Sequence, residues 1–301
     1  MKNPIAIAIT FAMIATSVTV FAASETSTPT AAKALVFTPP NDEEIPNNEF
    51  GKIVRQGKNI FEDTQHYAKQ YVGNSLNCVN CHLASGRKEN SSPLWAAYVR
   101  YPAYRAKNNK VNTYEERIQG CFKYSLNGKA PAVDSPEMVA LVTYSYWLAT
   151  GAPVGAKLKG AGYPEVPKPG LIPDANRGKT VFVENCQVCH GSNGEGKKVD
   201  GKYIFPPLWG SESFNWGAGM HRINTAAAFI KANMPLSKGG TLTDQEAWDV
   251  ATFVMSHERP QDPRFKGNVA QTKKEYHDEN CRYGETVNGK VLGGKHQTAA
   301  K

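Results

Sequence analysis

Two copies of one short motif constrain this chain more than any other feature. CVNCH spans residues 78–82, and CQVCH spans residues 186–190. Two thiols separated by two residues and followed at once by histidine form the attachment pattern of c-type haem, because the sulfurs bind the porphyrin and the histidine binds its iron. We therefore predict two covalently bound haem c groups, held through Cys78, Cys81 and His82 and through Cys186, Cys189 and His190.

Two other uses of paired cysteines fit the pattern less well. Zinc ribbons usually separate their CxxC pairs by about 15–20 residues, whereas more than one hundred residues lie between these pairs. A redox dithiol also uses CxxC. Neither interpretation explains why histidine follows both pairs.

The length and charge set broad limits. A chain of 301 residues is long enough for about two domains of roughly 100–200 residues each. The formal net charge is +8, but there is no basic low-complexity tract or nucleic-acid motif, so we predict no nucleic-acid partner. An anionic small substrate or an acidic redox partner fits this charge equally well.

The N-terminus has the pattern of a cleaved secretory signal over residues 1–23, with Lys2, an apolar run at residues 5–20 and two alanines at the end. The apolar run is short for a membrane span, so we predict no span in the mature protein. Haem attachment in bacteria takes place outside the cytoplasmic membrane. We therefore predict a periplasmic protein, in which spare cysteines could pair as disulfides.

An internal repeat organises the rest of the chain. A glycine followed four residues later by phenylalanine occurs in residues 55–61 (RQGKNIF) and again in residues 176–182 (NRGKTVF). Pro-Leu-Trp follows each haem motif, at residues 93–95 and 207–209. The chain therefore contains two related halves.

Each half is predicted to end in an amphipathic helix, over residues 135–150 and 243–257. This order of elements resembles the cytochrome c fold. We expect a mainly α protein with two cytochrome c-type domains joined by an extended Pro/Gly linker. The predicted parts are a signal peptide (1–23), an N-terminal arm (24–49), a first domain (50–150), a linker (151–176), a second domain (177–260) and a C-terminal tail (261–301).

The first half carries extra residues before its haem motif. Gly178 stands eight residues before Cys186, the usual spacing in cytochromes c, but Gly57 stands twenty-one residues before Cys78. The extra segment, residues 63–75, is expected to add a loop or helix near the first haem.

The sixth ligand of the second haem is predicted to be Met234, because residues 231–235 (KANMP) look like the methionine loop of cytochromes c. Met234 lies 25 residues after Trp209. Met220 is the nearest alternative ligand, but it lies too close to Trp209 for that loop. Core filling is the other use of a buried methionine.

The same distance counted from Trp95 in the first half falls near residue 120, where Cys121 lies. Met138 is on the predicted closing helix and is expected in the core. The alternative for Cys121 is a disulfide with Cys281, since these two cysteines remain after haem attachment. We favour the ligand role and expect Cys281 to be a free or partly buried thiol.

The two predicted ligand sets differ in their effect on iron. A thiolate lowers the reduction potential, whereas a methionine thioether raises it. Electrons that arrive at the first haem should therefore pass to the second. A simple carrier has no need of a cysteine ligand, so this one indicates a reactive site.

Residues 117–125 (RIQGCFKYS) resemble the dihaem thiosulfate dehydrogenases, and the likeness extends through YVGNSLNCVNCH, PPLWG and NMP over nearly all of residues 50–260. Those enzymes couple two thiosulfates into tetrathionate and release two electrons, and some run readily as tetrathionate reductases. The resemblance implies thiosulfate and tetrathionate as substrates. It also implies a soluble or membrane-bound cytochrome as electron partner.

Carried over residue by residue, the resemblance implies that Cys121 is the axial ligand of the catalytic haem, with Arg117 and Ser125 in the substrate pocket. Arg105, in YPAYRAK, is expected to be a second anion contact. A guanidinium and a hydroxyl suit the sulfonate oxygens of a dianion. Some relatives carry a lysine before the ligating methionine and exchange ligands, but here that residue is Asn233, so we expect no lysine exchange.

Two other classes of dihaem protein have different requirements. A dihaem electron carrier without its own substrate would need two His/Met domains and no anion pocket. A dihaem peroxidase would need an open distal position and usually a longer chain. The remaining histidines are expected to have no part in catalysis. We expect His257 near a helix C-terminus, His221 beside the second haem, and His66, His277 and His296 at the surface.

Overall fold

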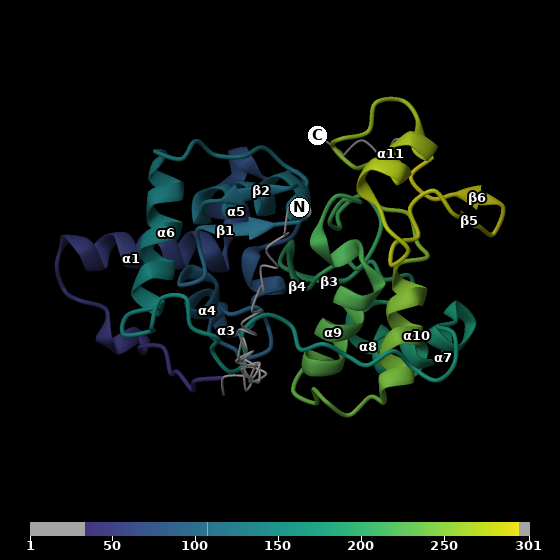
Figure 1. The fold of residues 1–301 in the computed structure, drawn as a ribbon, viewed down its shortest axis with the longest axis horizontal. Helices are drawn as coiled ribbons and strands as arrows, with labels where there is room; N and C mark the ends of the chain where they lie inside the picture. Colours follow the sequence, from purple (N-terminus) through teal and green to yellow (C-terminus); the bar gives the residue numbers. More distant parts are fainter. Residues whose placement is uncertain (1–33, 107, 295–301) are drawn as a thin grey trace, which may run out of the picture. The chain divides into compact units, whose positions relative to one another are not determined.

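The computed structural model describes residues 34–106 and 108–294 (Figure 1). The predicted signal peptide (1–23), the first part of the predicted arm and His296 lie outside these residues. Strands within the described ranges form three two-stranded antiparallel hairpins, and helices make up most of the remaining regular structure. The predicted mainly α class is therefore confirmed. No helix in these ranges has both the length and the apolarity needed to cross a bilayer.

The first half is framed by helices α1 (Glu49–Glu62) and α6 (Pro136–Leu148). Ser135 caps α6 by accepting a hydrogen bond from the backbone N–H of Met138, and Pro136 occupies the first turn, as is typical of helix N-termini. The predicted start of this closing helix is thus confirmed. The remaining elements are η1 (Asp42–Glu44), α2 (Thr64–Tyr67), η2 (Lys69–Tyr71), η3 (Cys78–Asn80), α3 (Leu83–Gly86), α4 (Leu94–Tyr98), β1 (Ala103–Arg105), β2 (Lys110–Asn112), α5 (Tyr114–Gly120) and the π-helical turn η4 (Cys121–Ser125).

The second half is framed in the same way by α7 (Ala175–Asn185) and α10 (Asp244–Val254). Thr243 and Glu246 form a reciprocal capping box at the start of α10, where the helix was predicted to begin. Between these helices lie α8 (Gln187–His190), β3 (Lys197–Val199), β4 (Lys202–Phe205), η5 (Gly219–His221) and α9 (Ile223–Asn233).

A glycine permits the helix crossing in each half. Helices α1 and α6 pack together, as do α7 and α10 (Figure 1). A Cβ on Gly57 would lie 2.0 Å from the carbonyl oxygen of Ala140, and a Cβ on Gly178 would lie 2.0 Å from that of Asp249. Any side chain at these positions would force the helices apart, which explains the glycine in both RQGKNIF and NRGKTVF.

The extra segment of the first half folds beside the first haem motif. Residues 63–75 include α2 and η2. The Thr64 hydroxyl accepts a hydrogen bond from the backbone N–H of Cys78 at 3.2 Å. The expectation of a helix near the first haem is therefore confirmed.

Buried amide side chains join the two halves. The Asn74 side-chain amide donates to the carbonyl oxygens of Ser125, at 2.8 Å, and Ser213, at 3.0 Å. The Asn233 side-chain amide donates to Asn90 O at 2.9 Å. Because these groups are buried, losing either partner would leave an unpaired polar atom.

The described part of the C-terminal tail is folded. It contains α11 (Val269–Tyr276) and a hairpin of β5 (Thr286–Val287) and β6 (Lys290–Val291). Its buried cluster contains Cys281, Tyr283 and Leu292 together with Trp216 of the second half. This cluster is separate from the main core.

Candidate functional site

One cavity of about 580 Å³ gathers the predicted residues of the first haem site. Its lining includes both cysteines and the histidine of CVNCH and all four predicted substrate-site residues: Cys78, Cys81, His82, Cys121, Arg117, Ser125 and Arg105. The structure thus brings together residues that lie up to 47 positions apart in the sequence.

The histidines of the two haem motifs are held in the same way in both halves. His82 Nδ1 lies 2.7 Å from Ser92 O, and His190 Nδ1 lies 2.9 Å from Pro206 O. Each carbonyl belongs to the residue just before a Pro-Leu-Trp motif. With the Nδ1 proton donated to the carbonyl, Nε2 keeps its lone pair for a metal, so both histidines fit haem iron. Burial also lowers the pKa of His190, which favours the neutral, metal-binding imidazole.

Cys121 is the first residue of the π-helical turn η4, which follows α5 directly. Such turns often occur at functional sites. Arg117 lies one turn earlier, and its Nη1 donates to Cys121 Sγ at 2.9 Å. Burial raises the pKa of the Cys121 thiol, but the charge of the neighbouring Arg117 guanidinium acts in the opposite direction, and the net pKa lies below the ordinary value of a thiol. The thiol is thereby favoured as a thiolate, the form that binds iron or attacks sulfur.

Neither Cys121 nor Cys281 forms a disulfide in the structure, so the alternative pairing of these two residues is not found. Met138 is fully buried on α6 and is not among the residues that line the cavity. It therefore belongs to the core, as predicted.

The first cavity is strongly basic. Arg105 lies on β1, and sequence reasoning missed two further arginines of the lining, Arg100 and Arg222. Arg222 comes from the second half and forms an ion pair with Asp278 at 2.8 Å. With Arg117 these make four guanidinium groups, and no carboxylate occurs among the described residues that line the cavity. Such a cavity attracts anions.

The second cavity, of about 290 Å³, is apolar. Cys186, Cys189, His190 and Met234 line it, and so do Met220 and Met255. No Arg, Lys, Asp or Glu side chain occurs among the described residues of this lining. The cavity alone does not distinguish Met234 from the other two methionines, so its ligand role stays a prediction.

The side chains of Asn233 and Lys231, which precede Met234, form hydrogen bonds of their own. Asn233 is fully buried, and its amide also donates to Phe229 O at 3.1 Å. Lys231 forms an ion pair with Asp244 at 3.1 Å and donates a hydrogen bond to Leu242 O. Neither side chain lines the second cavity.

The two cavities share part of one wall. Leu76 and Cys81 line both of them, and Val79 of the first haem motif lines the second. The segment that carries the first haem motif therefore forms part of the wall of both cavities.

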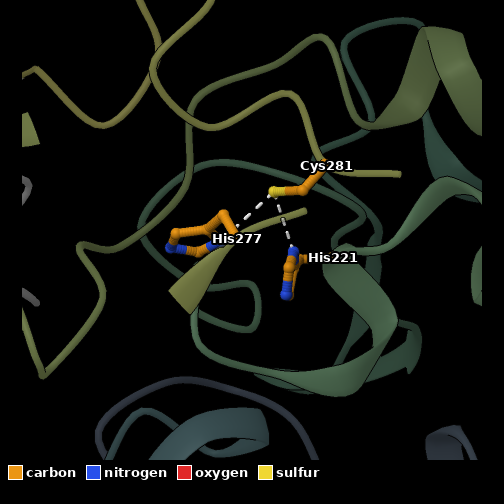
Figure 2. A group of neighbouring side chains, drawn as sticks. All are labelled: His221, His277 and Cys281. Carbon is orange, nitrogen blue, oxygen red and sulfur yellow. Dashed lines mark hydrogen bonds between the residues drawn. The ribbon is translucent and has the colours of Figure 1, made fainter. Parts of the chain in front are cut away.

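Two histidine predictions were wrong. His277 is buried and not at the surface, and His221 is fully buried but does not line the second haem cavity. Both rings lie beside the buried thiol of Cys281 (Figure 2). His66 is exposed, as predicted, while His257 follows α10 and stacks on Trp209 with ring centroids 3.9 Å apart.

Comparisons with known proteins agree with this geometry. Residues 62–154 match the family model of the SoxA/TsdA cytochrome c domain, and residues 175–258 match that of cytochrome c. Thiosulfate dehydrogenase of Stutzerimonas stutzeri is 58% identical over 260 residues, which cover 85% of each chain. That of Thiomonas intermedia is 57% identical over 258 residues, or 85% of this chain and 82% of the relative.

The chain belongs to the thiosulfate dehydrogenase family. A solved structure of thiosulfate dehydrogenase (TsdBA) from Marichromatium purpuratum superposes with a TM-score of 0.84 at 48% identity. It matches 88% of this chain, which in turn spans 59% of that longer chain. The predicted family, the two cytochrome c domains and haem c as the cofactor are thus confirmed. The roles of individual site residues stay predictions.

Proposed function

We propose that this chain is a periplasmic dihaem oxidoreductase that interconverts thiosulfate and tetrathionate. One observation carries the proposal: the cavity beside the first haem motif is lined by the half-buried thiol of Cys121 and by four guanidinium groups. A dihaem electron carrier without its own substrate needs neither feature. The family relatives named thiosulfate dehydrogenase support the same substrate.

The basic lining provides the binding step. Thiosulfate is a dianion, and guanidinium groups at Arg105 and Arg117 can hold its sulfonate oxygens through charge-assisted hydrogen bonds. The Ser125 hydroxyl can donate one more. Since Arg117 already contacts Cys121 Sγ at 2.9 Å, an anion bound to Arg117 would lie next to the thiol.

Cys121 then provides the sulfur chemistry. The Cys121 thiolate and the outer sulfur of one thiosulfate form a sulfur–sulfur bond, and two electrons leave. A second thiosulfate attacks that adduct with its outer sulfur, as in thiol–disulfide exchange. The Cys121 thiolate departs and tetrathionate is released, so the net reaction is two thiosulfates to one tetrathionate and two electrons.

Each haem, when bound, supplies a one-electron acceptor. The wall shared at Leu76 and Cys81 supports a short path from the first cavity to the second. A soluble or membrane-bound cytochrome would then take the electrons from the second haem.

The signal-like N-terminus and the need of c-type haem for attachment outside the cytoplasm support export to the periplasm. N-terminal sequencing of the purified protein tests the cleavage after residue 23. A mature chain that still begins at Met1 would contradict it.

An anaerobic optical titration tests the proposed reaction. We expect thiosulfate to reduce the haems of the oxidised protein, and tetrathionate to reoxidise them if the reaction is reversible. A carrier without its own substrate would show no reduction by thiosulfate, although ascorbate or dithionite would still reduce it.

A further inference from the structure

Three residues of metal-binding types, two histidines and one cysteine, meet outside both haem cavities. His221 ends the short helix η5 of the second half, His277 caps the C-terminus of α11, and Cys281 lies four residues further on. All three are buried, and the exposed fraction of Cys281 is 1%. Figure 2 shows both imidazole rings beside the same sulfur atom.

The ligand atoms are close to the spacing of a zinc site. Cys281 Sγ lies 3.0 Å from His221 Nδ1 and 3.3 Å from His277 Nδ1, and potential ligand atoms of all three residues lie within 4.8 Å of one another. Zn–S bonds of about 2.3 Å and Zn–N bonds of about 2.0–2.1 Å place sulfur and nitrogen about 3.6 Å apart in a tetrahedron. Each of the two sulfur–nitrogen pairs needs to separate by only about 0.3–0.6 Å to reach this spacing. We propose that His221, His277 and Cys281 bind one zinc ion.

Surrounding groups hold His277 in a binding orientation. Asp262 Oδ2 lies 3.2 Å from His277 Nε2, and both side chains are fully buried. A carboxylate at Nε2 keeps the proton there and leaves the Nδ1 lone pair for a metal, which is the usual arrangement behind metal-binding histidines. Arg264 pairs with the same carboxylate at 2.6 Å and fixes it.

The sulfur has a supporting donor of its own. The backbone N–H of Tyr283 donates to Cys281 Sγ at 3.3 Å, a contact that stabilises a thiolate. The Tyr283 ring also stacks on His277, with centroids 4.2 Å apart. On metal binding the thiol gives up its proton to solvent.

The donor set selects the kind of ion. One thiolate and two imidazoles suit Zn²⁺, which is of borderline softness. Ca²⁺ and Mg²⁺ prefer oxygen ligands, and the described cluster offers sulfur and nitrogen.

The zinc ion would fasten the tail to the second half. Helix α11 buries Thr272 alone, and the hairpin β5–β6 pairs only two residues on each side. Small units with so little core are commonly stabilised by a metal or a disulfide. Because His221 belongs to the second half and the other two ligands belong to the tail, one ion would crosslink them.

Metal analysis of the full-length protein with both haems attached tests this site. The protein is loaded with equimolar Zn²⁺, passed over a chelating resin, and assayed for zinc and iron together. The haem irons are an internal standard, and we expect one zinc for every two irons. Cys281→Ala should lower this ratio about tenfold or more, whereas His66→Gln, at an exposed histidine, should keep it.

X-ray absorption at the zinc edge identifies the ligands in the unmodified protein. We expect one sulfur at about 2.3 Å and two imidazole nitrogens at about 2.0–2.1 Å. Amide hydrogen exchange of residues 262–294 should be faster in Cys281→Ala than in the loaded protein.

Three outcomes would overturn the proposal: only trace zinc in the loaded protein, zinc content unchanged by Cys281→Ala, or a zinc coordination shell without sulfur. The first would mean that the cluster is held by hydrogen bonds alone. If Cys281→Ala fails to fold with its haems, the zinc-to-iron ratio and the coordination shell of the unmodified protein still decide.

Discussion

The two haem cavities share a frame but differ in charge. In both halves a glycine lets two helices cross, and the carbonyl before Pro-Leu-Trp fixes the histidine of the haem motif. The first cavity nevertheless contains a thiol and four arginines, whereas the second is apolar and contains three methionines. The frame therefore holds the haem, and the segments around it determine whether a half can bind an anion.

The source of the difference lies between Pro-Leu-Trp and the closing helix. In the first half this stretch forms the hairpin β1–β2, helix α5 and the turn η4, which carry Arg105, Arg117 and Cys121 into the cavity. In the second half it forms η5 and α9, and α9 ends at the residue before Met234. The same position in the repeat thus delivers a thiol in one half and a thioether in the other.

Of the substitutions considered, removal of the Cys121 thiol should have the largest effect on thiosulfate oxidation. We expect Cys121→Gly to lower thiosulfate oxidation by about 1,000-fold or more, because the group that forms the sulfur–sulfur bond is lost. Both haems should stay attached, since their thioether bonds use other cysteines. Steady-state kinetics and haem content check this prediction.

Met138→Leu is the matched control, since Met138 is a buried sulfur residue of the first half outside the cavity lining. It should retain near-normal turnover. Normal activity in Cys121→Gly, or its loss in Met138→Leu, would contradict the assignment of Cys121.

Removing one positive charge should weaken the first cavity less severely. We expect Arg117→Gln to lower kcat/KM by about 10–100-fold, because a charge-assisted hydrogen bond contributes about 1.5–3 kcal/mol and each 1.36 kcal/mol is a factor of ten. Arg55→Gln, at an exposed arginine on α1, should have little effect. Equal effects of the two substitutions would indicate a general loss of charge and not a site.

In the second cavity, substitution can show which methionine binds the haem iron. Met234→Leu should remove the charge-transfer band of methionine-ligated ferric haem and lower that haem's potential. Its effect on thiosulfate oxidation should be smaller than that of Arg117→Gln, because the sulfur chemistry takes place in the first cavity. The same spectroscopic change in Met220→Leu, with none in Met234→Leu, would transfer the ligand role to Met220.

The shared frame predicts equal effects on stability. Gly57→Ala and Gly178→Ala should each destabilise the protein by about 1–3 kcal/mol, since each new Cβ meets a backbone oxygen at 2.0 Å. Catalysis by the folded fraction should stay close to normal. Thermal unfolding measures the change, with Gly170→Ala in open space as control. A large difference between the first two variants would mean that the halves are not equivalent.

The sequence predicted the parts that depend on local patterns. Both haem motifs, the capped starts of α6 and α10, and the place of Cys121 in the first cavity followed from residue spacing. The ligand role of Cys121 stays a prediction. Arg222 was missed because it comes from the other half, about a hundred residues after Cys121. No periodic pattern in the sequence indicates that Arg222 and Cys121 line the same cavity.

The tail was misjudged for a related reason. His277 stands in a polar stretch, so composition placed it at the surface, yet the fold buries it against Cys281 and His221. A polar residue can be buried where other polar groups satisfy it. That satisfaction is a property of three-dimensional contacts and not of the neighbouring sequence.

The central claim is that substrate chemistry occurs at the first haem while electrons collect at the second. Electron paramagnetic resonance of the oxidised protein, frozen after anaerobic mixing with thiosulfate, tests it most directly because thiolate-ligated and methionine-ligated ferric haems give different signals. We expect the methionine-ligated signal to disappear first and the thiolate-ligated signal to persist, since its potential is lower. A protein without any thiolate-ligated signal, or one in which that signal disappears first, would contradict the claim.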